Sequence, residues 1–202
     1  MAHMTKSRLE AFSDGVIAII ITIMVLEIHV PSGHQLSDLR GVLPVLFGYL
    51  LSFVFVGIYW NNHHHMLQAV RHVNGPILWA NLHLLFWLSL VPFATSWMGH
   101  SGIEPGPVAF YGLVLLMSGV AYFILARALI ARHGNDSLLA RALGSDVKGI
   151  VSLVCYTIAI GTAFVMPMAS VALFVAVAIL WLVPDRRIER HLETAGPAPE
   201  RD

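Results

Sequence analysis

Charged residues are scarce in this sequence. Lys, Arg, Asp and Glu make up 12% of the 202 residues, roughly half of the ~25% found in a typical soluble domain. Hydrophobic residues make up 57% of the chain, and the mean hydropathy is +0.73. This apolar excess is too large for one soluble core, which excludes an ordinary cytosolic or secreted domain as well as a disordered chain.

Cysteine and net charge are also lacking. The single cysteine, Cys155, can form neither an internal disulfide nor a thiolate metal cluster. The 12 basic residues are balanced by 12 acidic ones, so the chain carries no nucleic-acid footprint. No secretory signal is expected, because the first apolar stretch is long and runs into Glu27 without a cleavage site. Residues 1–4 look like an expression scar and are left out of the predicted fold.

Long apolar runs are abundant. A bilayer-spanning helix needs about 20 mainly apolar residues, and runs of this kind predict six spanning helices, the last two short and joined by a tight apolar hairpin. The predicted helices cover residues 11–30, 41–62, 76–98, 106–131, 148–166 and 168–183. We therefore expect an all-α, multi-pass membrane protein with one domain over residues 5–184 and a polar tail over residues 185–202.

Lysine and arginine are distributed unevenly between the predicted loops. With the N-terminus inside, eleven of the twelve Lys and Arg residues fall on the cytoplasmic side, and only Arg40 falls outside. Basic residues are enriched in cytoplasmic loops, so this asymmetry predicts an even number of spans and cytoplasmic N- and C-termini. The expected location is the cell membrane, specifically the bacterial inner membrane.

The first predicted helix places an ionisable residue near each end of an apolar run, and such residues are costly within a span. Asp14 lies near the cytoplasmic end, and Glu27 follows thirteen positions later. On a wheel of 100° per residue, an apolar stripe lies within about 60° of Ile19. Its members are Phe12, Val16, Ile19, Thr22, Ile23, Leu26 and Val30. Ser13 and Asp14 lie about 120–140° away, so Asp14 is better placed to hold helices together than to touch an ion.

Several short motifs then resemble those of one family. Arg8-x-x-x-Phe12-Ser13-Asp14, followed by an Ile/Thr-rich helix ending in Leu26-Glu27-Ile28, resembles the signature of the transmembrane protein 175 family of potassium-permeable channels. Trp60-Asn-Asn-His63-His64 resembles the family's Trp-x-x-His-His segment, and Asn81-Leu82 and Pro92-Phe93-x-Thr95 resemble its next stretch. The match covers the first three predicted helices well and the last three mainly in hydrophobicity and length.

The resemblance implies a short prokaryotic form that assembles as a homotetramer around the first helix. Ile19, Ile23 and Leu26 would form the apolar constriction, Thr22 would favour potassium, and Glu27 would lie at the outer mouth. Arg8, Phe12, Ser13 and Asp14 would belong to a structural network whose partners are Trp60, His63, His64 and Asn81. The partners would be the lipid bilayer, potassium and other monovalent cations, with no cofactor, no metal and no nucleic acid.

Other interpretations of these residues remain open. The stripe could be ordinary helix packing, Thr22 could bond back to a carbonyl of its own helix, and Glu27 could be a plain interfacial residue. The tract His63-His64-His65 does not predict a metal site, because consecutive helical residues point about 100° apart. A membrane enzyme is not expected, since no nucleophile–base pair or hydrolase motif occurs. A proton-leak pathway and a secondary transporter remain the alternative functions.

Overall fold

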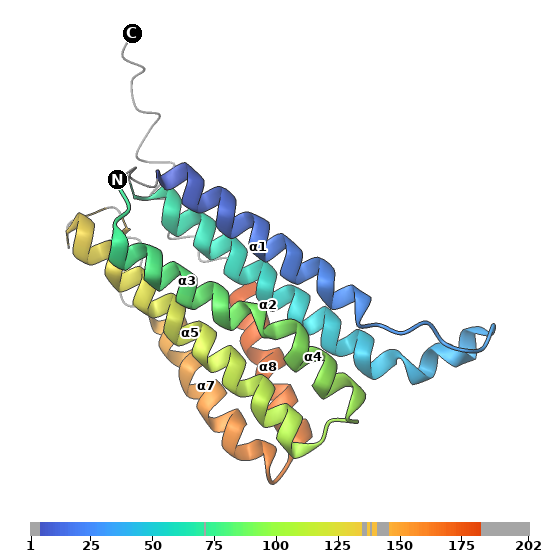
Figure 1. Ribbon diagram of the computed structural model, residues 1–202. Helices are drawn as coiled ribbons and strands as arrows, with labels where there is room; N and C mark the ends of the chain where they lie inside the picture. The colour runs from blue at the N-terminus through green and yellow to red at the C-terminus, as the bar shows by residue number, and fades with distance from the viewer. Residues whose placement is uncertain (1–4, 71, 135–136, 138, 141–145, 183–202) are drawn as a thin grey trace.

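The computed structural model describes residues 5–70, 72–134, 137, 139–140 and 146–182, and the regular secondary structure in these segments is helical (Figure 1). Residues 1–4 and the predicted tail over 185–202 lie outside this description. The elements are α1 (Lys6–Leu26), the 3-10 helix η1 (Leu36–Gly41), α2 (Leu43–Gln68), α3 (Gly75–Ser89), α4 (Val91–His100), α5 (Pro105–His133), α7 (Val147–Ala163) and α8 (Pro167–Leu182). The expected all-α class is confirmed.

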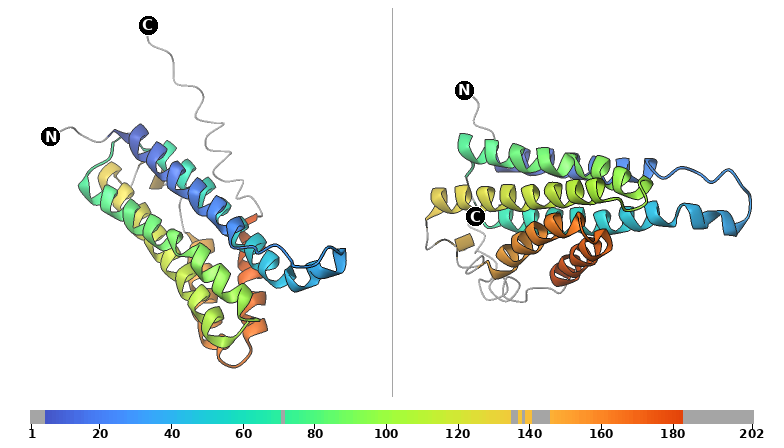
Figure 2. Two further views of the ribbon diagram at one scale, coloured as in Figure 1. Left: turned by 45° about the vertical axis from the view of Figure 1, so that its right-hand side comes forward. Right: turned by 90° about the horizontal axis from the view of Figure 1, so that it is seen from below.

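The helices form one elongated bundle with α1 on its outside. α1 packs against α2, α3 and α4, whereas α7 and α8 lie on the side of the bundle away from α1 (Figure 2). At one end, Lys6 Nζ donates to Gln68 O at 3.4 Å, and the backbone N–H of His72 donates to His133 Nε2 at 3.3 Å. The start of α1 therefore lies beside the end of α2, and the segment after α2 lies beside the end of α5.

Within the residues that the structure describes, four segments are long and apolar enough to cross a membrane. They are α1, α2, the α3–α4 pair over Gly75–His100, and α5. α7 and α8 have 17 and 16 residues, or about 24–26 Å at about 1.5 Å per residue, which is shorter than a hydrocarbon core of about 30 Å. The protein is thus a multi-pass membrane protein, while the six-span count and the sidedness of the termini stay predictions.

The first helix begins and ends about one turn earlier in the sequence than predicted. The prediction was 11–30, but α1 runs from Lys6 to Leu26. Thr5 caps its start by accepting from the backbone N–H of Arg8 at 3.4 Å, so the polar first turn, which hydropathy overlooks, is helical. Pro31 disfavours helical geometry at the preceding Val30, and Val30 therefore lies outside the helix and cannot extend the apolar stripe.

The second and third predicted helices also differ from the observed ones. The second was expected over 41–62, but α2 continues to Gln68 and includes all three consecutive histidines. The third was expected as one helix over 76–98, but it is broken into α3 and α4 at Leu90. Pro92 lacks the N–H that would bond to the Leu88 carbonyl, and its ring crowds that carbonyl, which explains the break.

A buried polar triad lies where α2, α4 and α5 meet. Ser52 Oγ lies 2.6 Å from Thr95 Oγ1 and 2.9 Å from Tyr111 Oη, and all three residues are buried. Thr95 also donates to the Val91 carbonyl at 2.7 Å. Because an unpaired hydroxyl in an apolar core is costly, this triad fixes the register of the three helices.

Gly99 allows α4 to approach the backbone of α2. A Cβ added at Gly99 would lie 2.9 Å from Val45 Cα, whereas one added at Gly57, inside α2, would meet nothing within 4 Å. We expect Gly99→Ala to destabilise the protein by about 1–3 kcal/mol through overpacking and Gly57→Ala to be neutral or slightly stabilising. Thermal unfolding in detergent measures both, and equal melting midpoints would contradict the close approach.

Candidate pore helix and its polar network

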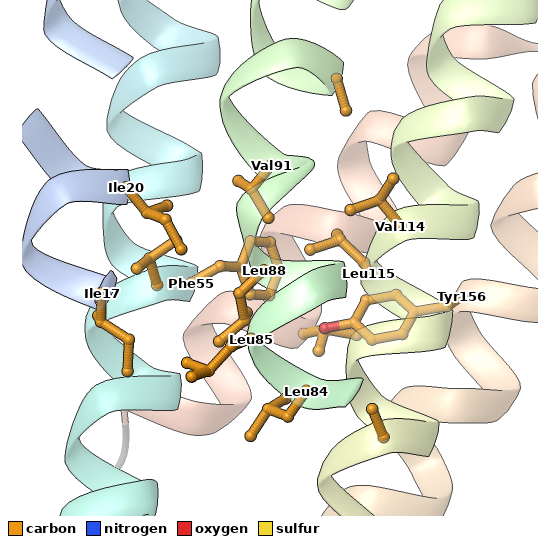
Figure 3. Packing of buried hydrophobic residues seen from close by; sticks show 14 of the residues in the cluster. Ile17, Ile20, Phe55, Leu84, Leu85, Leu88, Val91, Val114, Leu115 and Tyr156 are labelled. Atoms are coloured by element: carbon orange, nitrogen blue, oxygen red, sulfur yellow. The ribbon is translucent and has the colours of Figure 1, made fainter. Parts of the chain in front are cut away.

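α1 has one buried face and one exposed face. The buried residues are Leu9, Ser13, Ile17, Ile20 and Met24, and Figure 3 shows Ile17 and Ile20 pointing from α1 into the packed core. On the opposite side, Phe12 is 51% exposed, Ile19 58%, Ile23 41% and Leu26 77%. The central part of the predicted stripe is therefore largely exposed on the protomer, although Val16 on its edge is half-buried.

Thr22 lies on the exposed face of α1 and bonds to its own helix. Its hydroxyl donates to the carbonyls of Ala18 at 3.1 Å and Ile19 at 3.0 Å. A hydroxyl that donates in this way keeps oxygen lone pairs for a further partner. The bond to the helix and a contact with a cation are thus compatible, and the selectivity role of Thr22 stays a prediction.

A directional chain of hydrogen bonds lies behind the exposed face. Ser13 Oγ donates to the Leu9 carbonyl at 2.9 Å and accepts from Asn81 Nδ2 at 2.9 Å. The amide oxygen of Asn81 lies 2.7 Å from His63 Nε2. Because an amide oxygen can only accept, His63 must be the donor in this pair. All three side chains are buried. The chain ties α1 to α3 and α3 to α2 at one level of the bundle.

A second set of contacts involves Asp14 and the other histidine. Trp60 Nε1 donates to Asp14 Oδ1 at 3.0 Å, and the Trp60 ring stacks on His64 with 5.9 Å between centroids. His64 Nε2 in turn lies 2.8 Å from Gln68 Nε2. The histidines thus have different partners, and His63 rather than His64 joins the buried chain through Asn81.

Asp14→Ala is expected to destabilise the packing of α1 on α2 by about 0.5–1.5 kcal/mol, because the indole N–H of Trp60 loses its acceptor. Asp14→Asn is the matched control, since its amide oxygen can still accept that bond. Thermal unfolding of the detergent-purified protein compares the two variants. Equal losses for both would show that the hydrogen bond is not what Asp14 contributes.

Arg8 was expected in the same network, but the structure places it elsewhere. Its side chain is exposed, and among the described residues no hydrogen bond or ion pair holds its guanidinium. The nearby Lys6 instead pairs with Glu10 at 3.7 Å. The network within one protomer therefore centres on Ser13 and Asp14, without Arg8.

The opposite end of α1 adjoins an open groove. Glu27 is the C-terminal cap of α1, and its Oε2 accepts from Ser96 Oγ of α4 at 2.9 Å. Next to this bond, His29 and His100 meet edge to face at 5.5 Å between ring centroids. The groove has a volume of about 910 Å³ and runs along α1 and α4. Its apolar part includes Ile19, Ile23, Phe93 and Trp97.

Sequence reasoning missed two groups of residues in this region. Gln68 and Ser96 were not singled out, although they bond to His64 and Glu27. Ser52 and Tyr111 were also missed, since only Thr95 was noted, as part of a motif. A polar residue isolated inside an apolar run could have indicated these groups, because a buried polar side chain needs a hydrogen-bond partner.

Comparisons with known proteins identify relatives of this chain. A family model described as endosomal/lysosomal potassium channel TMEM175 matches residues 8–92, which span α1, α2, α3 and the start of α4. A protein named a potassium channel from Chryseobacterium sp. (strain P1-3) is 53% identical over 190 residues, which cover 94% of this chain and 99% of the relative. The mouse relative, named endosomal/lysosomal proton channel TMEM175, is 33% identical over 105 residues, which cover 46% of this chain and 21% of the mouse protein.

A solved structure is similar over most of the fold. The crystal structure of a lysosomal potassium-selective channel TMEM175 homolog from Chamaesiphon minutus has a TM-score of 0.76 and 28% identity to this chain. The match covers 88% of this chain and 96% of that one. These proteins are named as ion channels rather than enzymes, and the resemblance found in the sequence motifs is confirmed. The chain belongs to the TMEM175 family.

Proposed function

We propose that this protein is a potassium-permeable cation channel that conducts passively, without a cofactor, in the bacterial inner membrane. The observation that carries the proposal is the 53% identity, over 94% of the chain, to a relative named a potassium channel. In the proposed assembly four protomers, each with six spans and cytoplasmic termini, place α1 around a shared axis. Potassium would be the main permeant ion, and other monovalent cations could follow the same path.

The exposed face of α1 supports the position of the constriction. Ile19, Ile23 and Leu26 turn large apolar side chains away from their own protomer. In a fourfold arrangement these side chains would form rings that exclude water when narrow, and such dewetting gates ion flow. Thr22 would add four hydroxyl oxygens between the rings, and Glu27 would place carboxylates near the outer mouth.

The hydrogen-bond chain supports the orientation of α1. Ser13 is held by Asn81 and Asp14 by Trp60, so the polar side of α1 is fixed against α2 and α3. Turning the apolar stripe of α1 toward its own protomer would break both bonds and leave the buried amide of Asn81 without its acceptor, at about 1–3 kcal/mol. The network would thus keep the apolar stripe facing the proposed axis.

Reconstituted liposomes under a potassium gradient test the proposal. We expect fast, passive potassium efflux that requires no counter-ion. Saturable exchange that depends on a second ion would instead identify a secondary transporter and contradict the proposal.

Proton conduction is the second candidate, and one observation favours it. The mouse relative is named a proton channel. The same liposomes, loaded with a pH-sensitive dye and held at a membrane potential that an ion other than potassium sets, distinguish proton conduction from potassium conduction. A current carried by protons alone, with no potassium flux, would favour the proton pathway.

A further inference from the structure

A second cavity lies between α2, α5, α7 and α8, separate from the groove beside α1. Its volume is about 210 Å³. Aromatic side chains supply much of its wall, namely Phe55, Tyr59, Tyr122, Phe123, Tyr156 and Trp181. Gly119 lies beside it, and a Cβ added there would lie 2.8 Å from Leu153 Cδ2 and 3.7 Å from the Tyr59 hydroxyl. The absence of a side chain at Gly119 thus helps to keep the space open.

Three of the polar residues that line this cavity form no side-chain hydrogen bond within the described part of the chain. The hydroxyls of Tyr59 and Tyr122 and the amide of Asn62 line it, and no hydrogen bond to another described residue engages any of them. The two tyrosine rings meet edge to face at 6.2 Å between centroids. Polar groups in an apolar surrounding are costly without a partner, so a ligand with acceptor oxygens would be favoured here.

The lining also carries one positive and one negative charge. Arg127 lies with its guanidinium 4.9 Å from the centroid of the Phe123 ring. Asp146 caps α7 by accepting from the backbone N–H of Gly149 at 2.9 Å through Oδ1. No ion pair joins Arg127 to Asp146 in the described residues. The cavity therefore presents separated charges of both signs.

The surroundings indicate that the ligand enters from the bilayer. Phe123 and Ile150, which line the cavity, are apolar and 38% and 59% exposed, and Val154 on α7 is 52% exposed. A volume of 210 Å³ is smaller than the range of about 300–1,000 Å³ that is usual for drug-sized ligands. An amphiphile whose polar region enters the cavity, with its hydrocarbon along α7, fits both observations.

We propose that this cavity binds the ester and head-group region of a zwitterionic phospholipid that carries a primary ammonium group. Arg127 binds the phosphate and Asp146 binds the ammonium group. The hydroxyls of Tyr59 and Tyr122 donate to the ester carbonyls, and the acyl chains run along the exposed face of α7. The site belongs to one protomer and does not depend on the proposed pore.

Native mass spectrometry of the full chain, delipidated and then supplied with phosphatidylethanolamine or phosphatidylglycerol, tests the assignment. We expect the wild type to retain phosphatidylethanolamine in preference to phosphatidylglycerol. Arg127→Gln should reduce retention of phosphatidylethanolamine about tenfold, because a charge-assisted bond is lost. Asp146→Asn, which keeps a capping side chain for α7, should reduce retention of phosphatidylethanolamine and leave phosphatidylglycerol unchanged.

Arg132→Gln is the matched control, since Arg132 is an exposed arginine on the same helix that does not line the cavity. Its lipid retention should equal that of the wild type. The double variant Tyr59→Phe/Tyr122→Phe removes two donors at nearly constant shape and should also weaken retention. Equal retention in all variants, equal losses for Arg127→Gln and Arg132→Gln, or a wild-type preference for phosphatidylglycerol would overturn the proposal.

Discussion

Ile23→Asn is expected to raise the basal potassium flux of the reconstituted protein by about tenfold, which corresponds to a barrier lowered by about 1.4 kcal/mol. The Ile23 side chain is 41% exposed on α1 and belongs to the apolar stripe. In the proposed tetramer the change would replace a ring of four isoleucines with a ring of amides that hydrogen-bond water. The constriction would then stay wet, and its discrimination between potassium and sodium would weaken.

Val25→Asn is the matched control for this experiment. Val25 is exposed to a similar extent, 46%, but lies on another side of α1, about 120° from Ile19 on a wheel of 100° per residue. Val25→Asn should leave the potassium flux unchanged. Efflux from liposomes loaded with potassium compares the two variants at equal protein content. Equal flux from wild type, Ile23→Asn and Val25→Asn would count against a constriction at Ile23.

Asn81→Leu is expected to lower the stability of the folded protein by about 1–3 kcal/mol, the cost of leaving a buried polar group unpaired. Asn81 is the central member of the chain between Ser13 and His63, and both of its partners are buried. Its loss would leave the His63 Nε2–H without an acceptor. Because α1 is held to α3 by this amide, the yield of the assembled oligomer should fall as well.

The double variant Asn81→Leu/His63→Leu separates the hydrogen bond from simple packing. Replacing both partners with apolar side chains removes the unpaired donor, so the double variant should be more stable than the sum of the two single variants predicts. Melting midpoints in detergent, with size-exclusion profiles for assembly, provide the comparison. A wild-type midpoint for Asn81→Leu would contradict a structural role for the chain.

The two faces of α1 could be predicted from the sequence because helical periodicity alone separates them. The wheel placed Ser13 and Asp14 away from Ile19, and Ser13 is indeed buried while Ile19 is exposed. The membrane class was predictable for a similar reason, since composition and run length depend only on local sequence. Predictions of this kind require no knowledge of which helices are neighbours.

Features that depend on tertiary contacts could not be predicted. Three consecutive histidines look equivalent in the sequence, and only the position of Asn81 on α3 selects His63. Arg8 belongs to the motif, yet its side chain is exposed. Its place in the motif, four residues before Phe12, does not determine whether its guanidinium contacts another helix. The break between α3 and α4 at Leu90 was predictable in principle from Pro92. Mean hydropathy over a window of residues does not register a single proline, so the prediction was one continuous helix.

The most direct test asks whether α1 faces a shared axis. In a Cys155→Ser background, Leu26→Cys would place thiolates from all four protomers around the proposed axis, since Leu26 is 77% exposed at the end of α1. Convergent thiolates bind soft metal cations, so Cd²⁺ should block potassium flux through Leu26→Cys, and a chelator should restore it. Potassium flux through Met24→Cys, whose position is only 2% exposed inside the protomer, should not respond to Cd²⁺. Flux through Leu26→Cys that ignores Cd²⁺, or equal block at Met24→Cys, would contradict the placement of α1 at the centre of the channel.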